Sequence, residues 1–555
     1  MSPADRARWG APAAFGLALL FAAYPPLATL AEHGLSGAFR YLDGDAFYYL
    51  TVAKRSAGAA FYTYDGRFPT NGFHPLWQYY LTFGFARLGL GPEGQVLFAF
   101  LSGVAFAAVG TCLFAAALQR ATGSVALALL ASVPGLYYLL LPTLNEHYFS
   151  QWSWANGMES SLSVLFFGAL CFALVNRRLL AAGLSVPRVL VLTALLTAMV
   201  LSRLDDIFLF VPFGALVLAA RGAPRQKLLR AVAFGAVPLV CIGAYLAYNL
   251  SYAGTLLPVS GAEKNQGPYG LARNGYAVLT TALPFLDLFD RGRVDWVSEA
   301  WRVLQMLVPA AAAAAWLGSD RRRLLERLRD GRCDARFALT LLCVYVILKA
   351  SYNFVLVPLW QQGQWYFPIS LMLFGWGVAA TLERVGAVRA LSGAPALAVV
   401  LALLVLEANA FVEVKHSGGL GQPAYRIWVR RDAIAREVER VCPGCGLLEF
   451  DDGLFSYSLP MPVMSGTGLS LDATAFEARR RGELLEVAFA RGVRLFTSHS
   501  YRMAPEVYAD PKALRTGLES YGLLRGQDLS GWDFETVHFD AASGVAFVAF
   551  RPKSF

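Results

Sequence analysis

Long uncharged apolar runs are the feature of this sequence that most limits its fold. Several hold about 18 residues or more, roughly the length that a helix needs to cross a hydrocarbon layer of about 30 Å. Only 16% of the 555 residues are charged, whereas an average soluble protein has roughly 25%. We therefore predict an α-helical polytopic membrane protein. An intrinsically disordered chain, a small disulfide scaffold and a soluble nucleic-acid-binding protein are excluded.

Basic loops between the runs predict the orientation of the chain. These loops, rich in Arg, lie at residues 177–178, 221–230, 321–336 and 384–389. Loops of this kind face the cytoplasm in membrane proteins. The net charge of +9 is therefore better explained by cytoplasmic loops than by binding to an anionic partner. Counting from them, we expect an external location for residues 142–158, 251–300, 358–365 and the chain from about 412 onward.

The count of spans follows from this orientation. The apolar runs lie near 11–31, 73–90, 94–118, 122–141, 159–176, 185–202, 205–220, 228–250, 301–317, 337–357, 366–382 and 391–411. The run 11–31 ends on the external side and the run 94–118 begins there, so residues 73–90 cannot cross the membrane between them. The mixture of aromatic and polar residues in 73–90 suits the membrane interface. We expect about eleven transmembrane helices, with the first a retained anchor and residues 32–93 one external loop containing an interfacial helix.

Two domains are predicted. Residues 1–411 form the membrane domain, and residues 412–555, whose composition is that of a soluble protein, form an extracytoplasmic α/β domain. Short apolar segments at 446–450, 493–497 and 544–550 are interleaved with charged helical segments such as 425–441, which is the pattern of a small α/β sandwich.

Polar and aromatic residues near the ends of the spans gather on the predicted external side. Ionisable residues at such positions are functional candidates because burying them is costly. We expect one outward-facing polar cavity lined by Asp43, Asp45, Asn71, His74, Glu159, Arg203, Asp205, Lys264, Gln364, Trp365 and Tyr366.

Each of these residues has a plainer interpretation. Asp43 and Asp45 fit a general base with a second acid or metal ligand, but Asp-Gly is also a common turn. Arg203 suits phosphate binding, an ion pair with Asp205, or a side chain that simply reaches the interface. Lys264 taken alone reads as a solvated loop residue.

Metal binding has little support in the membrane part. His74 has no second His nearby and is better explained by a structural role at a helix start. Paired Cys and His with zinc-ligand spacing are absent from the membrane part of the sequence. We predict no metal ligand, and leave open whether a divalent cation binds.

Several motifs resemble the GT-C superfamily of membrane glycosyltransferases, which includes protein O-mannosyltransferases, aminoarabinose transferases and arabinofuranosyltransferases. The motifs occur in order along residues 35–370. They are Asp43-Gly-Asp-Ala-Phe-Tyr-Tyr-Leu, Thr70-Asn-Gly-Phe-His-Pro-Leu-Trp77, Asn156-Gly-Met-Glu-Ser160, Ser202-Arg-Leu-Asp205, Leu257-Pro-Val-Ser-Gly-Ala-Glu-Lys264 and Gln364-Trp-Tyr-Phe-Pro368.

This resemblance implies an inverting transfer of a hexosyl or pentosyl unit from a polyprenyl-phosphate donor. The acceptor would be a hydroxyl of a cell-envelope glycan, lipid or protein, outside the bacterial plasma membrane. In the family an Asp of the first external loop is the base and basic residues hold the leaving phosphate, sometimes with a divalent cation. Because Gly44 replaces an expected acidic residue, the base is Asp45 or, second, Asp43. The resemblance thus favours Arg203 and Lys264 as phosphate-binding residues.

Two matters stay open in the sequence. The Cys442-Pro-Gly-Cys445 pair is expected to form a local disulfide in an oxidising external compartment, with a free or metal-binding pair as the alternative. A transporter or lipid-linked sugar flippase is the main alternative function, although no internal repeat of the kind common in transporters is evident. A non-catalytic scaffold that binds envelope polymer is the third.

Overall fold

The computed structural model describes most of the chain and divides it into two compact units. The described residues are 3–42, 44–133, 154–265, 321–357, 364–366, 368–384, 393–416, 421–450, 453–499, 505–520, 524 and 526–553. One unit, called here the helical unit, comprises Met1–Ala31, Leu101–Ala244 and Lys264–His416. The other, called the sheet unit, comprises Glu32–Phe100, Tyr245–Glu263 and Ser417–Phe555.

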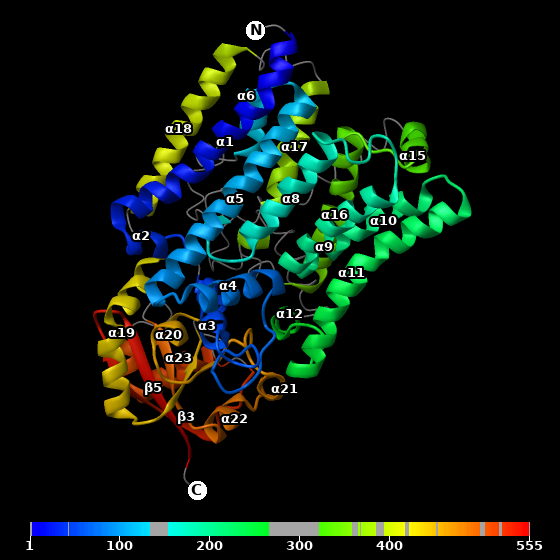
Figure 1. Ribbon diagram of the computed structural model, residues 1–555. Helices are drawn as coiled ribbons and strands as arrows, with labels where there is room; N and C mark the ends of the chain where they lie inside the picture. The colour runs from blue at the N-terminus through cyan, green and yellow to red at the C-terminus, as the bar shows by residue number, and fades with distance from the viewer. Residues whose placement is uncertain are drawn as a thin grey trace, which may run out of the picture. The chain divides into compact units, whose positions relative to one another are not determined.

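Helices make up the described part of the helical unit (Figure 1), and most of them are apolar, whereas α15 is rich in Arg. Wholly or mainly in this unit are α1 (Pro3–His33), α5 (Pro92–Thr122), α6 (Val125–Ser132), α8 (Ser160–Val175), α9 (Val186–Ser202), η3 (Leu204–Leu209), α10 (Phe210–Ala219), α11 (Pro224–Ala253), α15 (Arg321–Asp330), α16 (Ala335–Leu356), η6 (Gln364–Tyr366), α17 (Pro368–Arg384) and α18 (Ala394–His416). Helices α5 and α11 each continue into the sheet unit.

Among the described residues, five helices are long and apolar enough to cross a membrane. They lie within α1, α5, α11, α16 and α18, and three shorter apolar helices lie at Ser160–Val175, Val186–Ser202 and Pro368–Leu382. The chain is thus a multi-pass membrane protein, but the expected number of about eleven spans is not confirmed. The predicted run at 205–220 forms the two short helices η3 and α10, and the run at 301–317 lies outside the described residues.

Glycine lets two pairs of helices in this unit approach closely. A Cβ atom on Gly168 of α8 would lie 2.1 Å from the carbonyl oxygen of Gly110 in α5, and one on Gly375 of α17 would lie 2.1 Å from that of Ala131 in α6. No side chain fits at such distances, so the backbones themselves are in contact. Small residues serve this purpose in membrane helices, where packing replaces the hydrophobic effect.

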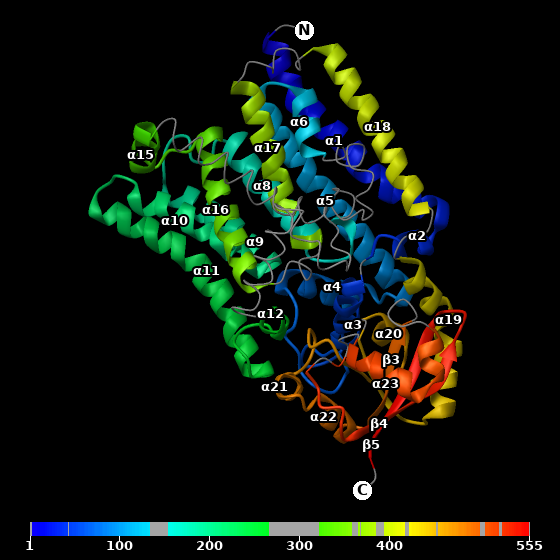
Figure 2. The ribbon, with the colours of Figure 1, turned by 180° about the vertical axis from the view of Figure 1, so that it is seen from behind.

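The sheet unit combines a five-stranded sheet with helices from three parts of the chain (Figure 2). Its strands are β1 (Gly446–Glu449), β2 (Val463–Ser465), β3 (Val493–His499), β4 (Trp532–Asp540) and β5 (Val545–Pro552). Its helices include α2 (Leu35–Phe39), α3 (Gly44–Ser56), α4 (Pro75–Leu88), α19 (Gly421–Val441), α20 (Leu454–Ser458), α21 (Ala473–Arg481), α22 (Leu484–Ala490), η8 (Pro505–Ala509) and α23 (Pro511–Ser520). Helix α12 (Val259–Lys264) ends at the boundary between the units.

The strand order is β2-β1-β3-β5-β4, with β2, β1 and β3 parallel and the pairs β3–β5 and β5–β4 antiparallel. Alternate side chains supply two cores. Phe450, Phe496 and Phe550 pack in one core with α21, α22 and α23, and the other joins β-strand residues to Ile427 and Ile434 of α19. The predicted small sheet in the C-terminal part is present, and β1 and most of β5 are buried at successive residues, as expected for strands that are covered by helices on both faces.

Residues 32–93, which the sequence predicts to form the first external loop, belong to the same unit as the sheet. Thr51 of α3 bonds to Ser456 at 3.1 Å, and the hydroxyl of Tyr64 donates to the Glu449 carboxylate at 2.9 Å. The sequence grouped residues 32–93 with the membrane domain, because a chain pattern cannot reveal contacts between segments about 400 residues apart. Helix α4, at the expected interfacial segment, has 14 residues, about 21 Å, and is too short to span.

Cys442 and Cys445 form a disulfide. It follows α19 and precedes β1, so it closes the tight turn between them. The expected local disulfide is therefore present.

Candidate functional site

Arg203 is the centre of a buried polar cluster in the helical unit. It ends α9 in an extended conformation, and η3 begins at the next residue. Its Nη1 donates to Glu159 Oε1 at 2.8 Å and to the carbonyl oxygen of Trp365 at 2.7 Å, while Nε lies 2.9 Å from Asp205 Oδ1. Only 3% of the Arg203 side chain and 1% of Glu159 are exposed. Buried ion pairs need such multiple contacts, because each charge has lost its water.

Lys349 brings a second cation to this cluster from α16. Its Nζ lies 3.4 Å from Asp205 Oδ2 and 2.5 Å from Asp206 Oδ1. Asp206, which is fully buried, also accepts a hydrogen bond from the Tyr345 hydroxyl at 2.5 Å. Tyr345, Lys349 and Asn353 are spaced by four residues and so share one face of α16. This polar face meets the acidic η3 segment.

The Tyr366 ring is close to two cations. The Arg203 guanidinium carbon is 4.1 Å from the centre of its ring, and Lys264 Nζ is 5.6 Å from that centre and 5.8 Å from the Trp365 ring. Cations are attracted to aromatic faces at such distances. The 3₁₀ turn at 364–366 is thus held by Arg203 through both a backbone bond and a ring contact. The Gln364 side chain lies outside the described part of the structure.

In the sheet unit, Asp45 occupies the first turn of α3 and is half-buried. A carboxylate is favoured at a helix N-terminus, where backbone N–H groups carry partial positive charge. Asp43 lies outside the described residues. The structure therefore describes the position of the first candidate base and not that of the second.

Asn71 and His74 organise the loop between α3 and α4. The buried Asn71 amide donates to Thr255 Oγ1 at 2.8 Å, and its oxygen accepts the Val259 N–H at 3.2 Å. His74 precedes α4 as its cap residue, and its N–H donates to the Tyr49 hydroxyl at 3.4 Å. Both contacts tie chain segments together. In this geometry the two residues hold the loop in place.

Lys54 of α3 has a partly buried ammonium group. Its Nζ donates to the carbonyl oxygen of Tyr457 at 2.8 Å. Burial, followed by the nearby positive charges of Arg55 and Arg431, lowers the pKa of Lys54 to about 8. Burial likewise raises the pKa of the Tyr62 hydroxyl to about 12, so that it stays protonated at neutral pH.

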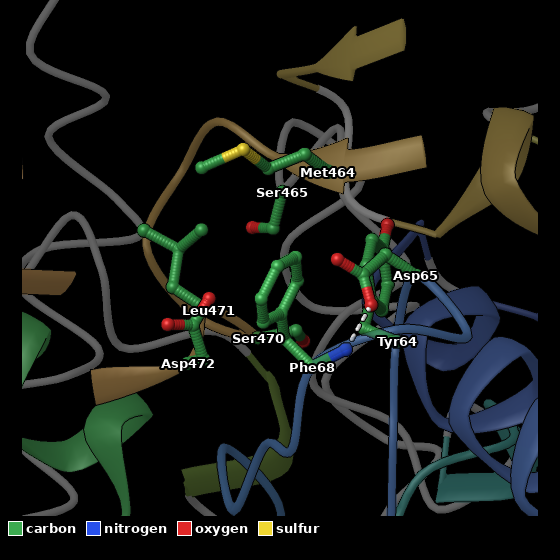
Figure 3. A pocket seen from close by; sticks show the side chains of 8 residues that line it. All are labelled: Tyr64, Asp65, Phe68, Met464, Ser465, Ser470, Leu471 and Asp472. Carbon is green, nitrogen blue, oxygen red and sulfur yellow. Dashed lines mark hydrogen bonds between the residues drawn. The ribbon is translucent and has the colours of Figure 1, made fainter. Parts of the chain in front are cut away.

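A small pocket of the sheet unit is drawn in Figure 3. It is lined by Tyr64, Asp65, Phe68, Met464, Ser465, Ser470, Leu471 and Asp472. Asp65 Oδ1 accepts the Phe68 N–H at 2.8 Å, and Asp472 caps α21 and pairs with Arg491 at 2.6 Å. Both carboxylates therefore serve local structure, and the chemistry of the pocket is limited.

The structure brings Glu159, Arg203, Asp205, Trp365 and Tyr366 together, with Lys264 beside the last two. Asp206, which neighbours the candidate Asp205 between two apolar runs, joins the cluster, and it is completed by Lys349, Tyr345 and Asn353, which the sequence did not select. A signal for Lys349 was present, since it is an ionisable residue inside the apolar run 337–357.

The described residues do not fit a divalent cation. A hard cation needs several carboxylate or carbonyl oxygens with uncompensated charge, whereas Glu159, Asp205 and Asp206 are each bonded to Arg203 or Lys349. Within the part of the chain that the structure describes, no group of three His, Cys, Asp or Glu residues is arranged as a metal site.

No family model matches the sequence, and no curated protein matches it. Solved structures do. An oligosaccharyltransferase from Archaeoglobus fulgidus, crystallised tethered to an acceptor peptide by a disulfide bond, superposes with a TM-score of 0.52 and 14% identity, covering 90% of this chain and 70% of that one. This likeness shows a shared fold.

Two further structures of the archaeal enzyme match less well. One, in complex with an inhibitory peptide and dolichol-phosphate, has a TM-score of 0.47 and 13% identity over 90% of this chain and 71% of that one. The other, in complex with zinc and sulfate, has a TM-score of 0.47 and 13% identity, over 89% and 69% of the two chains.

Proposed function

We propose that this chain, which has the GT-C fold, is an inverting glycosyltransferase that uses a polyprenyl-phosphate-linked sugar. The fold carries this proposal. The buried Arg203 and the half-buried Lys264, both close to the Tyr366 ring, support it, because a leaving phosphate needs positive charge in a place shielded from water. The acceptor is a hydroxyl of an envelope glycan, lipid or protein, on the external face of a bacterial plasma membrane.

Arg203 and Lys264 are the proposed phosphate-binding residues. The hydrogen bonds that Arg203 donates to other described residues come from Nη1, and Nε lies 2.9 Å from Asp205 Oδ1, so we assign the Nη2 donors to a phosphate oxygen. Lys264 contributes a second positive charge 5.6 Å from the centre of the Tyr366 ring. Charge-assisted bonds of this kind are roughly twice as strong as neutral ones. Glu159 and Asp205 act by orienting the guanidinium.

Asp45 is the proposed general base, with Asp43 second. Its carboxylate takes the proton of the acceptor hydroxyl as the oxygen attacks the anomeric carbon. The bond from that carbon to the phosphate oxygen breaks, its electron pair leaves with polyprenyl phosphate, and the configuration inverts. A positioned carboxylate typically contributes about 10²–10⁴-fold to such a step. Asn71 and His74 contribute by holding the loop that follows α3.

The experiment is a transfer assay with the purified protein and a panel of polyprenyl-phosphate hexoses and pentoses. Release of polyprenyl phosphate in the presence of an envelope extract is the expected result. Asp45→Asn should abolish release while the donor is still retained, and Lys264→Gln should weaken donor retention. Asp533→Asn and Arg225→Gln, both at exposed positions, are the matched controls.

Other outcomes separate the alternatives. If both Asp45→Asn and Asp43→Asn transfer sugar at the wild-type rate, the proposed base is wrong. If no donor is consumed but lipid-linked sugar crosses a reconstituted bilayer, the protein is a flippase and not a transferase. A peptide, a glycan and a lipid acceptor are tested separately, since each contains the required hydroxyl.

A further inference from the structure

The carboxylates around Arg203 each form an ion pair with Arg203 or Lys349. Asp205 has Oδ1 at 2.9 Å from Arg203 Nε and Oδ2 at 3.4 Å from Lys349 Nζ, so both of its oxygens face positive charge. Glu159 shares the guanidinium through Nη1 at 2.8 Å. Asp206 lies 2.5 Å from Lys349. Each acidic side chain therefore has a protein cation in direct contact.

A metal ion would compete with these cations for the same oxygens. To bind Glu159 and Asp205 together, it would have to take the place of Arg203. The displaced guanidinium has a side chain only 3% exposed, and it would be left buried without its partners. Removing one member of a buried ion pair is strongly unfavourable. These ion pairs therefore disfavour a metal ion at this position, whereas unpaired carboxylates would attract one.

We propose that Arg203 and Lys349 supply the positive charge that a divalent cation would otherwise supply at this place, so that the transfer step needs no metal. Arg203 bonds the leaving phosphate through Nη2. Lys349 is a positioning residue, which holds Asp205 and Asp206 and through them keeps Arg203 in place. This inference rests on the proposed glycosyl transfer, but its main test does not.

The main test measures binding of Mn²⁺ to the full-length protein in detergent. The electron paramagnetic resonance signal of the free ion reports how much Mn²⁺ remains unbound. Wild-type protein and Glu159→Gln should deplete free Mn²⁺ equally. Arg203→Ala should gain one bound Mn²⁺, because Glu159 and Asp205 lose their shared cation, and the double variant Arg203→Ala with Glu159→Gln should lose it. Arg225→Ala, which changes an exposed arginine in the first turn of α11, should behave as wild type.

The inference is overturned if wild-type protein binds one Mn²⁺ that Glu159→Gln abolishes. This comparison uses two variants that keep Arg203, so it decides the question even if Arg203→Ala fails to fold. Transfer that is lost in EDTA and restored by Mn²⁺ would also overturn it, whereas transfer unchanged by EDTA supports it. If no donor is turned over under any condition, the proposed transfer fails while the Mn²⁺ titration still reports on the cluster.

Lys349→Met separates positioning from direct binding. Its expected effect is a weaker retention of polyprenyl phosphate, together with a partial gain of Mn²⁺ binding as Asp205 and Asp206 lose their ammonium partner. Adding Asp206→Asn should reverse that gain. If Lys349→Met changes neither the retention of polyprenyl phosphate nor the binding of Mn²⁺, Lys349 neither positions Arg203 nor keeps a metal ion out of the cluster.

Discussion

The ammonium of Lys349 lies 2.5 Å from Oδ1 of Asp206, and the two residues are 143 positions apart in the sequence. Both side chains are buried, one in α16 and the other in η3. The pair fixes the turn after α9 against the polar face of α16. Since Arg203 stands at that turn, this contact links the packing of α16 to the position of the guanidinium.

Lys349→Met should destabilise the protein by about 3–5 kcal/mol, because it leaves a buried carboxylate without its cation. The thermal midpoint in detergent, measured by size-exclusion chromatography, checks this. The double variant with Asp206→Asn should recover part of the loss. Lys227→Met, at an exposed position of α11, is the control, and an equal midpoint in Lys349→Met and Lys227→Met would contradict the prediction.

Gly168→Ala should also lower the thermal midpoint. Its new Cβ would lie 2.1 Å from the carbonyl oxygen of Gly110, so α5 and α8 must move apart. Overpacking of this kind costs about 1–3 kcal/mol or more. Gly235→Ala in α11, where nothing lies within 4 Å of the added atom, is the matched control. A midpoint no lower than that of Gly235→Ala would show that the two backbones are not in contact.

Tyr64→Phe should loosen the attachment of the loop between α3 and α4 within the sheet unit. The Tyr64 hydroxyl donates to Glu449 and accepts the Gly453 N–H at 2.8 Å. Leaving these buried groups unpaired costs about 1–3 kcal/mol. Hydrogen exchange at the Gly453 amide should become faster. Tyr248→Phe, whose ring is 38% exposed, should leave that amide unchanged, and slow exchange in Tyr64→Phe would rule out the network.

Lys54 should make the stability of the sheet unit depend on pH. Its pKa is about 8 in the folded protein, against 10.5 for an ordinary lysine. Between these values the unfolded chain binds the proton and the folded protein does not, so stability rises with pH across that window and is flat below it. Thermal midpoints from pH 7 to pH 10.5 check the sign. Lys54→Met should remove this rise, and an unchanged profile would assign it to another group.

Local patterns in the sequence predicted much of the fold. The apolar runs identified a multi-pass membrane protein, and short apolar segments located β1, β3 and β5. Motifs in order along the chain predicted the GT-C fold, which the structural likeness confirms. These features depend on neighbouring residues, so a sequence displays them directly. The number of spans was less secure, because hydropathy could not tell that residues 205–220 form two short helices.

In the candidate site, too, the sequence indicated some residues and only the tertiary structure revealed the others. The sequence selected Glu159, Arg203 and Asp205 because each is an ionisable residue near the end of an apolar run. Only the tertiary structure decided that Lys349 and Asp206 join them, since that requires α16 to pack against η3. It also decided that residues 32–100 form one unit with the sheet. Burial makes such distant charges depend on each other, and a linear pattern of residues does not record which of them share a buried space.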